Sequence, residues 1–433
     1  MIVISVIVTI IVAFLILHKP YLGIVFTAAS VPIADVLPQV PLASSIVPIM
    51  GAITLAGFLW HRKNERDLPL FRLSQIHLLG LLFIFWIFVS NPQAAWFGRD
   101  RNWIFTFAQL WVLFWLAGEL LDTPKKQHLF MWVFSGVTMI SAFIAIQQGG
   151  FGDDIDPLIR ASGLAQGANT AARYFVIAIV FFNYLRIVHR IKFLAMLSVL
   201  GMLVTFFGVF ATASRTGMLL LLAALGLMAL LQKRFKYSVQ VIIVFMLALA
   251  ALLTVSDQIA GLFETIMPAV IAGTDTIGLR YKLWEAGILM WNDHILGGVG
   301  VGMYRWELYK YAQTLLAPRY WQSTTHNTYI QVLAETGIVG FIIFISLIIA
   351  TLKNYFSVTD GELVGIRNAW VVIFATMLLG AITKSDQADK MLWLIMGISV
   401  YYRNHPKFGY KKDSISKKAD DSFVRPKRRV VGY

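Results

Sequence analysis

The chain has 433 residues, of which 58% are hydrophobic and 14% charged, and its formal net charge is +14. Soluble domains contain about 45–50% apolar and about 25% charged residues, so this composition excludes a soluble protein and indicates an all-α polytopic membrane protein. The absence of cysteine excludes thiol chemistry and thiolate metal sites.

Apolar runs long enough to cross a bilayer as helices recur from one end of the chain to the other. We expect about 12 transmembrane helices (12–13), and the count stays open because prolines interrupt the first 60 residues. The expected spans lie near 2–17, 21–36, 43–60, 75–91, 103–121, 128–147, 171–188, 193–212, 217–232, 238–255, 328–351, 368–383 and 390–402.

Lysine and arginine are concentrated in alternate loops, which places those loops in the cytoplasm because positive charge resists translocation. The opposite set faces the periplasm or the cell exterior and comprises 91–102, 148–170, 213–216, 256–327 and 384–389. We expect a transmembrane domain over residues 1–402 with a large outer loop at 256–327. The basic tail 403–433 is expected to be disordered and cytoplasmic, and either contacts membrane lipids or only anchors the topology. Nucleic acid is not an expected partner.

The cytoplasmic loops are too short to hold a nucleotide-binding domain. The glycine-rich run at 297–302 lacks the strand, helix and Lys-Ser/Thr of a phosphate cradle, so we interpret it as a tight turn. A substrate used on the outer face must therefore arrive with the membrane or on another exported molecule.

Arg215 lies in a tight outer connection between two apolar spans, with Ser214 and Thr216 beside it. A charge at the edge of a helix bundle is a functional candidate, and a guanidinium matches phosphate bidentately. The alternative is an arginine that reaches lipid headgroups. Another outer segment offers further donors for phosphate or sugar, namely Arg160, Asn169 and Arg173.

Apolar residues recur every three or four positions over 279–291, which predicts an amphipathic helix along the outer membrane interface. This helix would hold Arg280, with Tyr281 next to it, near Arg215, although its charges could also be incidental. Asp154 and Asp156 have the spacing of a metal-binding pair, but a solvated loop or helix cap is favoured, so neither metal nor cofactor is expected.

His326 immediately precedes the next span and is followed by Asn327. An imidazole with an ordinary pKa of about 6.5 suits a general base, although a single histidine is more often structural. Glu335 lies a little over two helical turns further on and should face the bundle interior, paired with a cation or a hydroxyl.

These pieces, in this order, resemble the O-antigen ligase and O-antigen polymerase superfamily of membrane glycosyltransferases. The matching text is Ser-Arg-Thr-Gly at 214–217, Gly-Leu-Arg at 278–280, His-Ile-Leu-Gly-Gly-Val-Gly at 294–300, and His326-Asn327 followed by Gly337 and Gly340. The 160–173 segment departs from the family's usual text because Ala168-Asn169-Thr170 lacks its proline.

The resemblance implies a GT-C-like enzyme of the bacterial inner membrane with a periplasmic active site and a donor glycan on undecaprenyl pyrophosphate. It further implies that Arg215 and Arg280 bind the pyrophosphate and that His326 is the catalytic base of a metal-independent, inverting transfer. We favour a ligase that uses a lipid A-core oligosaccharide acceptor. The alternatives are an O-antigen polymerase or a protein O-oligosaccharyltransferase with the same donor and, more remotely, a lipid-linked glycan flippase or transporter.

Overall fold

A computed structural model describes residues 11–37, 46–64, 71–97, 102–148, 160–231, 276–313, 316, 320–359 and 361–404, and every regular element in these ranges is helical. Six of the described helices are long and apolar enough to cross a membrane, which makes the protein a multi-pass membrane protein. They are α6 (Trp103–Leu120), α7 (Pro124–Gln148), α8 (Ala168–Val188), α9 (Lys192–Ala211), α15 (Thr328–Tyr355) and α16 (Leu363–Gly380).

The other expected spans that fall on described residues are helical too. They correspond to residues 11–18, α2 (Tyr21–Ser30) with η1 (Val31–Ile33), α3 (Ile46–Asn64), α4 (Gln75–Ser90), α10 (Arg215–Leu231) and residues 390–404. The expected span at 238–255, the pair Asp154 and Asp156, and the tail from 405 lie outside the described residues.

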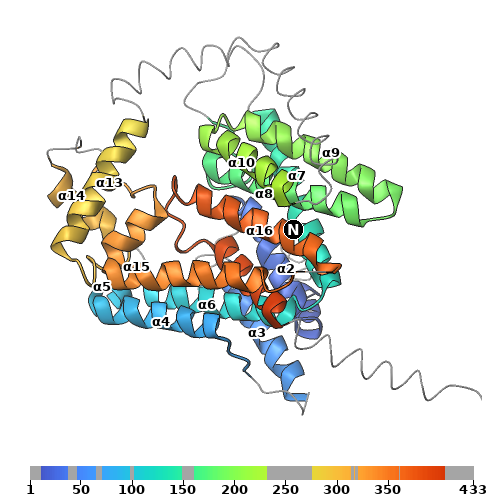
Figure 1. Cartoon of the computed structure of the whole chain (residues 1–433), viewed down its shortest axis with the longest axis horizontal. Coiled ribbons are helices and arrows are strands. Elements are labelled where there is room, and N and C mark those ends of the chain that lie inside the picture. Colours follow the sequence, from blue (N-terminus) through green and yellow to red (C-terminus); the bar gives the residue numbers. More distant parts are fainter. Residues whose placement is uncertain are drawn as a thin grey trace, which may run out of the picture.

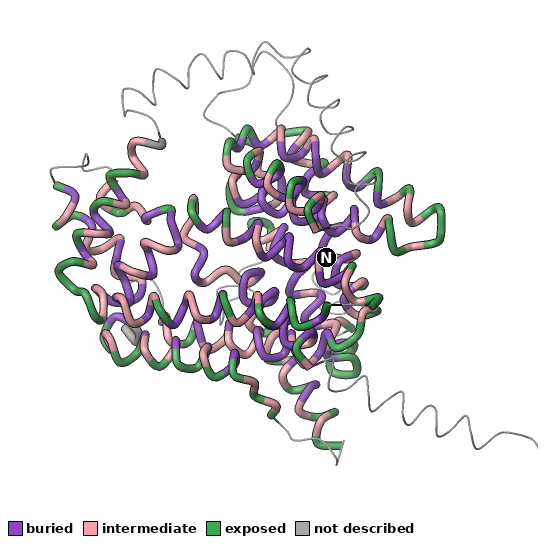
Figure 2. Tube along the Cα trace, in the orientation of Figure 1, coloured by how far each residue is buried: buried purple, intermediate pink, exposed green. Residues whose placement is uncertain are grey.

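The long helices form two neighbouring groups (Figure 1). In one group α15 packs along α4, which packs along α6; in the other, α7, α8 and α9 pack against one another, and α10 and α16 pack on α8. Nearly every residue of α8 is buried, and Figure 2 shows buried positions concentrated where the helices meet. A helix that is apolar all round is expected at the centre of a bundle.

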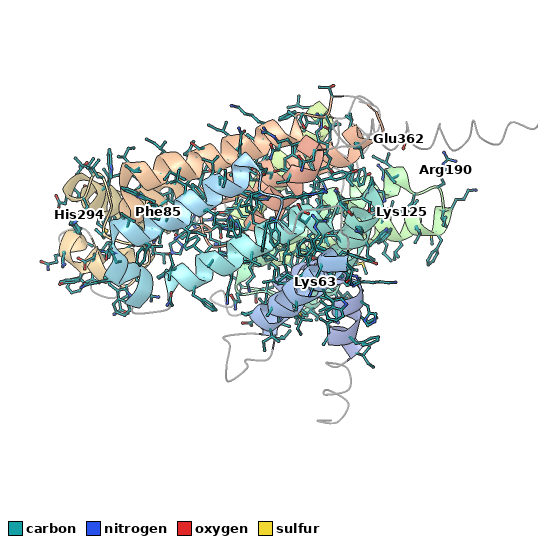
Figure 3. The ribbon with its side chains drawn as sticks, turned by 90° about the horizontal axis from the view of Figure 1, so that it is seen from below. Lys63, Phe85, Lys125, Arg190, His294 and Glu362 are labelled. Atoms are coloured by element: carbon teal, nitrogen blue, oxygen red, sulfur yellow. The ribbon has the colours of Figure 1, made fainter. Side chains whose placement is uncertain are left out.

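Three residues of the predicted cytoplasmic loops and one residue of the opposite set lie at opposite ends of the bundle. Figure 3 shows Lys125, Arg190 and Glu362 at one end and His294 at the other. The end that carries His294 also holds α5 (Pro92–Phe97), α13 (Thr276–Asp293) and α14 (Tyr304–Ala312), which follow no transmembrane pattern. We call this the outer end, after the side on which the sequence analysis expects these loops.

The amphipathic helix predicted at 279–291 is α13, but its apolar face does not lie on lipid. Leu283, Ala286 and Met290 are fully buried and pack with Tyr304 and Leu308 of α14. Lys282 and Glu285 on the opposite face are exposed. The apolar stripe is therefore covered by α15 together with α14, a helix that the sequence analysis did not anticipate.

Helix α15 is broken at Gly337, whose φ of 65° and ψ of −172° are not helical. The glycine turn, residues 297–302, fills this break: Val299 and Gly300 donate backbone N–H groups to the carbonyls of Ala334 and Glu335, both at 2.9 Å. The carbonyl of Thr336 accepts from the Trp86 indole at 2.8 Å. Carbonyls released by a helix break must find other donors away from water, and here backbone and indole N–H groups supply them.

The glycines of this turn are required by conformation as well as by space. Gly298, Gly300 and Gly302 all have positive φ, which L-residues rarely adopt. A Cβ on Gly298 would lie 2.4 Å from the backbone of Glu335. The interpretation of this run as a tight turn is confirmed.

Candidate functional site

The turn between α9 and α10 presents Arg215 at the first position of α10. Ala213 adopts a left-handed φ of 46°, and the Ser214 hydroxyl then accepts the N–H of Gly217 at 3.0 Å. Ser214 thus caps the helix in the usual way for a serine at this position. The backbone N–H groups at this helix N-terminus carry partial positive charge, and the Arg215 guanidinium adds a full positive charge beside them.

Arg160 and Asn169 hold this turn from the side. The Arg160 guanidinium donates to the carbonyls of Thr212 and Ala213 at 3.2 and 3.0 Å, and to Asn169 Oδ1 at 3.2 Å. Asn169 Oδ1 also accepts from the Ser214 hydroxyl at 2.8 Å. Asn169 Oδ1 therefore acts as an acceptor that organises the turn, while the donor role expected of this residue stays a prediction.

Arg160, Arg215 and Arg280 form an arginine cluster at the outer end. Partial burial lowers the pKa of Arg160, and the charges of Arg215 and Arg280 lower it further. Arg215 comes from α10 and Arg280 from α13, so the fold brings together guanidinium groups that are far apart in the sequence. Positive charges that act on one another in this way favour the binding of an anion.

His326 belongs to a loop, residues 323–327, that hydrogen bonds hold on both sides; we call it the histidine loop. Its φ of 51° is left-handed, a conformation that an L-residue keeps only when its surroundings impose it. On one side the Thr325 carbonyl accepts from the Trp284 indole of α13 at 3.0 Å. On the other, Asn327 caps α15 by accepting the N–H groups of Tyr329 and Ile330 at 3.0 and 3.2 Å.

The His326 side chain is exposed, yet the protein around it removes part of its hydration. This desolvation lowers the pKa of His326, and the charges of Arg280 and Lys384 lower it further. A histidine with a lowered pKa is neutral at physiological pH, as a proton acceptor must be. Arg280 thus contributes to both the arginine cluster and the surroundings of the histidine.

Lys384 belongs to the connection 381–389, which Arg173 fixes to the bundle. The Arg173 side chain is 2% exposed and pairs with the carboxylates of Asp386 and Asp389. Burial alone would raise the pKa of Asp386, but Arg173 and Lys384 together lower it. The sequence analysis expected Arg173 to donate to phosphate or sugar; the structure instead buries it in α8, which begins at Ala168, against two carboxylates.

Glu335 is buried, as expected, and receives N–H donors in place of the cation or hydroxyl that was expected. The backbone N–H of Tyr304 donates at 3.3 Å, and Gly302, Gln331 and Gln387 donate as well. The carboxylate borders a cavity of about 290 Å³ lined by Trp103, Gly302, Arg305, Thr324, Gln331, Glu335, Ser385 and Gln387.

The remaining predicted residues lie at the edge of this region. Thr216 is half-buried in the first turn of α10. Tyr281 is 62% exposed, and its ring packs edge-on against Trp284 with centroids 5.2 Å apart. The sequence analysis did not single out Lys384 or Arg305. Lys384 could have been found, because it is a lysine in a short predicted outer loop that holds few other cations.

The described residues thus define a helical, multi-pass membrane protein with a cationic site and a histidine at one end of its bundle. In a comparison with family models, residues 200–345 match the family described as O-Antigen ligase. This segment contains Arg215, Arg280 and His326, whereas Arg160 and Lys384 lie outside it. Proteins of this family are membrane enzymes that transfer glycans. A comparison with curated proteins found no match to the chain.

Proposed function

We propose that the protein is an O-antigen ligase. It transfers a glycan from undecaprenyl pyrophosphate to a lipid A-core oligosaccharide at the periplasmic face of the bacterial inner membrane. The observation that carries the proposal is the position of Arg280, whose charge acts on Arg160 in the arginine cluster and on His326. This supports a site in which the group proposed to bind an anionic leaving group lies near the group proposed to accept a proton.

In the reaction, a hydroxyl oxygen of the acceptor attacks the anomeric carbon of the donor glycan. The new C–O bond forms as the bond to the lipid diphosphate breaks, on the opposite face of the ring, so the configuration inverts. His326 accepts the hydroxyl proton. The diphosphate leaves with the bonding electron pair, and Arg215 and Arg280 stabilise its charge, each charge-assisted hydrogen bond contributing roughly 1.5–3 kcal/mol.

The fold supports a metal-independent route because the cations that it needs are side chains. Arg160 fixes the turn that carries Arg215, so the cluster is preorganised before the donor binds. Among the described residues, the connections between helices hold no large soluble domain for docking a protein acceptor, which favours the ligase over the protein glycosyltransferase.

The test is a transfer assay with purified full-length protein, a glycan on undecaprenyl pyrophosphate, and three acceptors in turn: lipid A-core, a second lipid-linked repeat, and a Ser/Thr peptide. We expect product with lipid A-core alone, and undiminished product in the presence of a chelator. Product only with the lipid-linked repeat or only with the peptide would replace the ligase by a polymerase or by a protein glycosyltransferase.

The role of His326 is tested by His326→Ala, which should abolish transfer and leave donor binding largely unchanged. The matched control is His294→Ala, because His294 is an exposed histidine at the same end of the bundle. Full transfer activity in His326→Ala would exclude His326 as the base.

A further inference from the structure

The cavity beside Glu335 lies next to the histidine loop and apart from the arginine cluster. Thr324 and Ser385 line it. Thr324 lies two residues before His326 in the histidine loop, and Ser385 directly follows Lys384. None of the three arginines is among the described residues that line it. Its volume of about 290 Å³ is close to the lower end of the range of small-ligand pockets, about 300–1,000 Å³, which suits one sugar ring.

Gln387 lines this cavity and carries a buried hydrogen-bond acceptor that has no partner among the described residues. The residue is 6% exposed, and its amide donates to Glu335. Among the residues that the structure describes, no donor reaches Gln387 Oε1. Because buried polar atoms are nearly always hydrogen-bonded, an acceptor left open at the wall of a cavity indicates a ligand that donates, such as a hydroxyl group.

The other walls complete a surface of the kind that binds a carbohydrate. Arg305 supplies donors, Thr324 and Ser385 supply hydroxyls, and the Trp103 indole supplies a flat apolar wall for the C–H face of a ring. Gly302 permits this arrangement, since a Cβ there would lie 1.9 Å from Trp103 Nε1. An apolar wall with a few convergent polar groups is the usual composition of a ligand site.

A hydrogen-bonded chain connects the cavity with the position of His326. Gln331 Oε1 lies 2.9 Å from the Thr325 hydroxyl and accepts from the Ser385 hydroxyl at 3.1 Å. Gln331 also donates to Glu335, so the cavity wall and the histidine loop share one network. A ring held in the cavity would therefore contact the same network that holds the histidine loop.

We propose that this cavity binds one pyranose ring of the acceptor oligosaccharide, with Gln387 Oε1 and Arg305 as the groups that orient it. The proposal rests on the proposed glycan transfer and adds to it the place where the acceptor binds. The acceptor is favoured over the donor because the cavity borders the histidine loop, whereas the arginine cluster marks the place of the diphosphate.

The test measures the KM for each substrate with full-length protein and two variants. Gln387→Met keeps the shape of the side chain and removes both its acceptor and its donor to Glu335. Thr324→Val leaves that donor in place and removes a hydroxyl with no role in the capping network, so an effect shared by both variants reports on the cavity. We expect Gln387→Met to raise the KM for the acceptor about ten-fold, and Thr324→Val to raise it several-fold, with the KM for the donor unchanged in both. The matched control, Gln313→Met at an exposed position after α14, should leave both values unchanged.

A second measurement uses free lipopolysaccharide core oligosaccharide as the probe, without donor, and detects its binding by saturation-transfer NMR. We expect binding to wild-type protein and to the control, and a loss of signal with both cavity variants, whose thermal unfolding is measured in parallel. An unchanged acceptor KM in both cavity variants, or a rise in the donor KM alone, would overturn the acceptor site. Absence of transfer by wild-type protein with every acceptor would instead contradict the proposed function.

Discussion

Asn169 and Ser214 are joined by a hydrogen bond of 2.8 Å between the serine hydroxyl and the asparagine Oδ1, and this bond connects the first turn of α8 to the turn that presents Arg215. The same Oδ1 accepts from Arg160. One amide oxygen therefore fixes the relative positions of two members of the arginine cluster.

Replacement of Asn169 by leucine should weaken donor binding without removing any arginine. Loss of the shared acceptor leaves Arg160 and Ser214 without one partner each, so we expect a several-fold rise in the KM for the lipid-linked donor and a smaller change in kcat. Steady-state kinetics with the donor varied would show it. Gln166→Leu, an exposed amide in the same segment, is the control, and equal effects of both variants would contradict the role of Asn169.

Lys384→Met should shift the acidic limb of the pH–rate profile. His326 must be neutral to accept a proton, so kcat/KM rises as pH rises through its pKa, which lies below the ordinary value of 6.5. Removal of a positive charge that lowers this pKa moves the midpoint upward, toward 6.5, and the shift should shrink at high salt. Lys282→Met on the exposed face of α13 is the control; a midpoint that does not move in Lys384→Met would contradict the coupling.

Gly337→Ala should destabilise the fold strongly. Its φ is positive, and a Cβ there would lie 2.1 Å from the Leu296 carbonyl oxygen, so helix and turn must separate. We expect a loss of about 2–4 kcal/mol in the free energy of unfolding, combining backbone strain and lost hydrogen bonds. Gly136→Ala in α7, where a Cβ meets nothing within 4 Å, should be neutral or slightly stabilising. Thermal unfolding in detergent compares them, and similar melting temperatures would contradict the argument.

Arg173→Met should destabilise the protein because it leaves the Asp386 and Asp389 carboxylates buried without their cation. Breaking one side of a buried pair costs roughly 3–5 kcal/mol. The double variant Arg173→Met with Asp386→Asn removes part of the orphaned charge and should recover part of the stability. If the double variant were less stable than Arg173→Met, so that the two substitutions added as independent losses relative to wild type, the ion pair would not be the cause.

The helices could be predicted because each span is a long apolar run, and the described spans agree with the predicted ones within a few residues. Interactions between sequence neighbours could also be predicted. Ser214 before Arg215 is an example, since a serine before a helix start has a characteristic capping role. The burial of Arg173 was not, because its partners Asp386 and Asp389 lie more than 200 residues away, and no local pattern specifies such a pair.

The same limit applies to α13 and to the cavity. The apolar stripe of α13 was visible, but the surface that covers it belongs to α14, a nine-residue helix with no strong pattern of its own. The cavity joins α6, α14, α15 and the 381–389 connection, and its chemistry arises only when these segments meet.

The break in α15 sets a fixed length between two landmarks. His326 stands before the helix start, Gly337 stands at the break where the glycine turn is bound, and residues 327–336 lie between them. Each residue added to this interval would turn one landmark by about 100° and advance it by about 1.5 Å relative to the other. The length of this interval therefore fixes the position of His326 relative to the glycine turn, and an insertion here would misalign the imidazole with its surroundings.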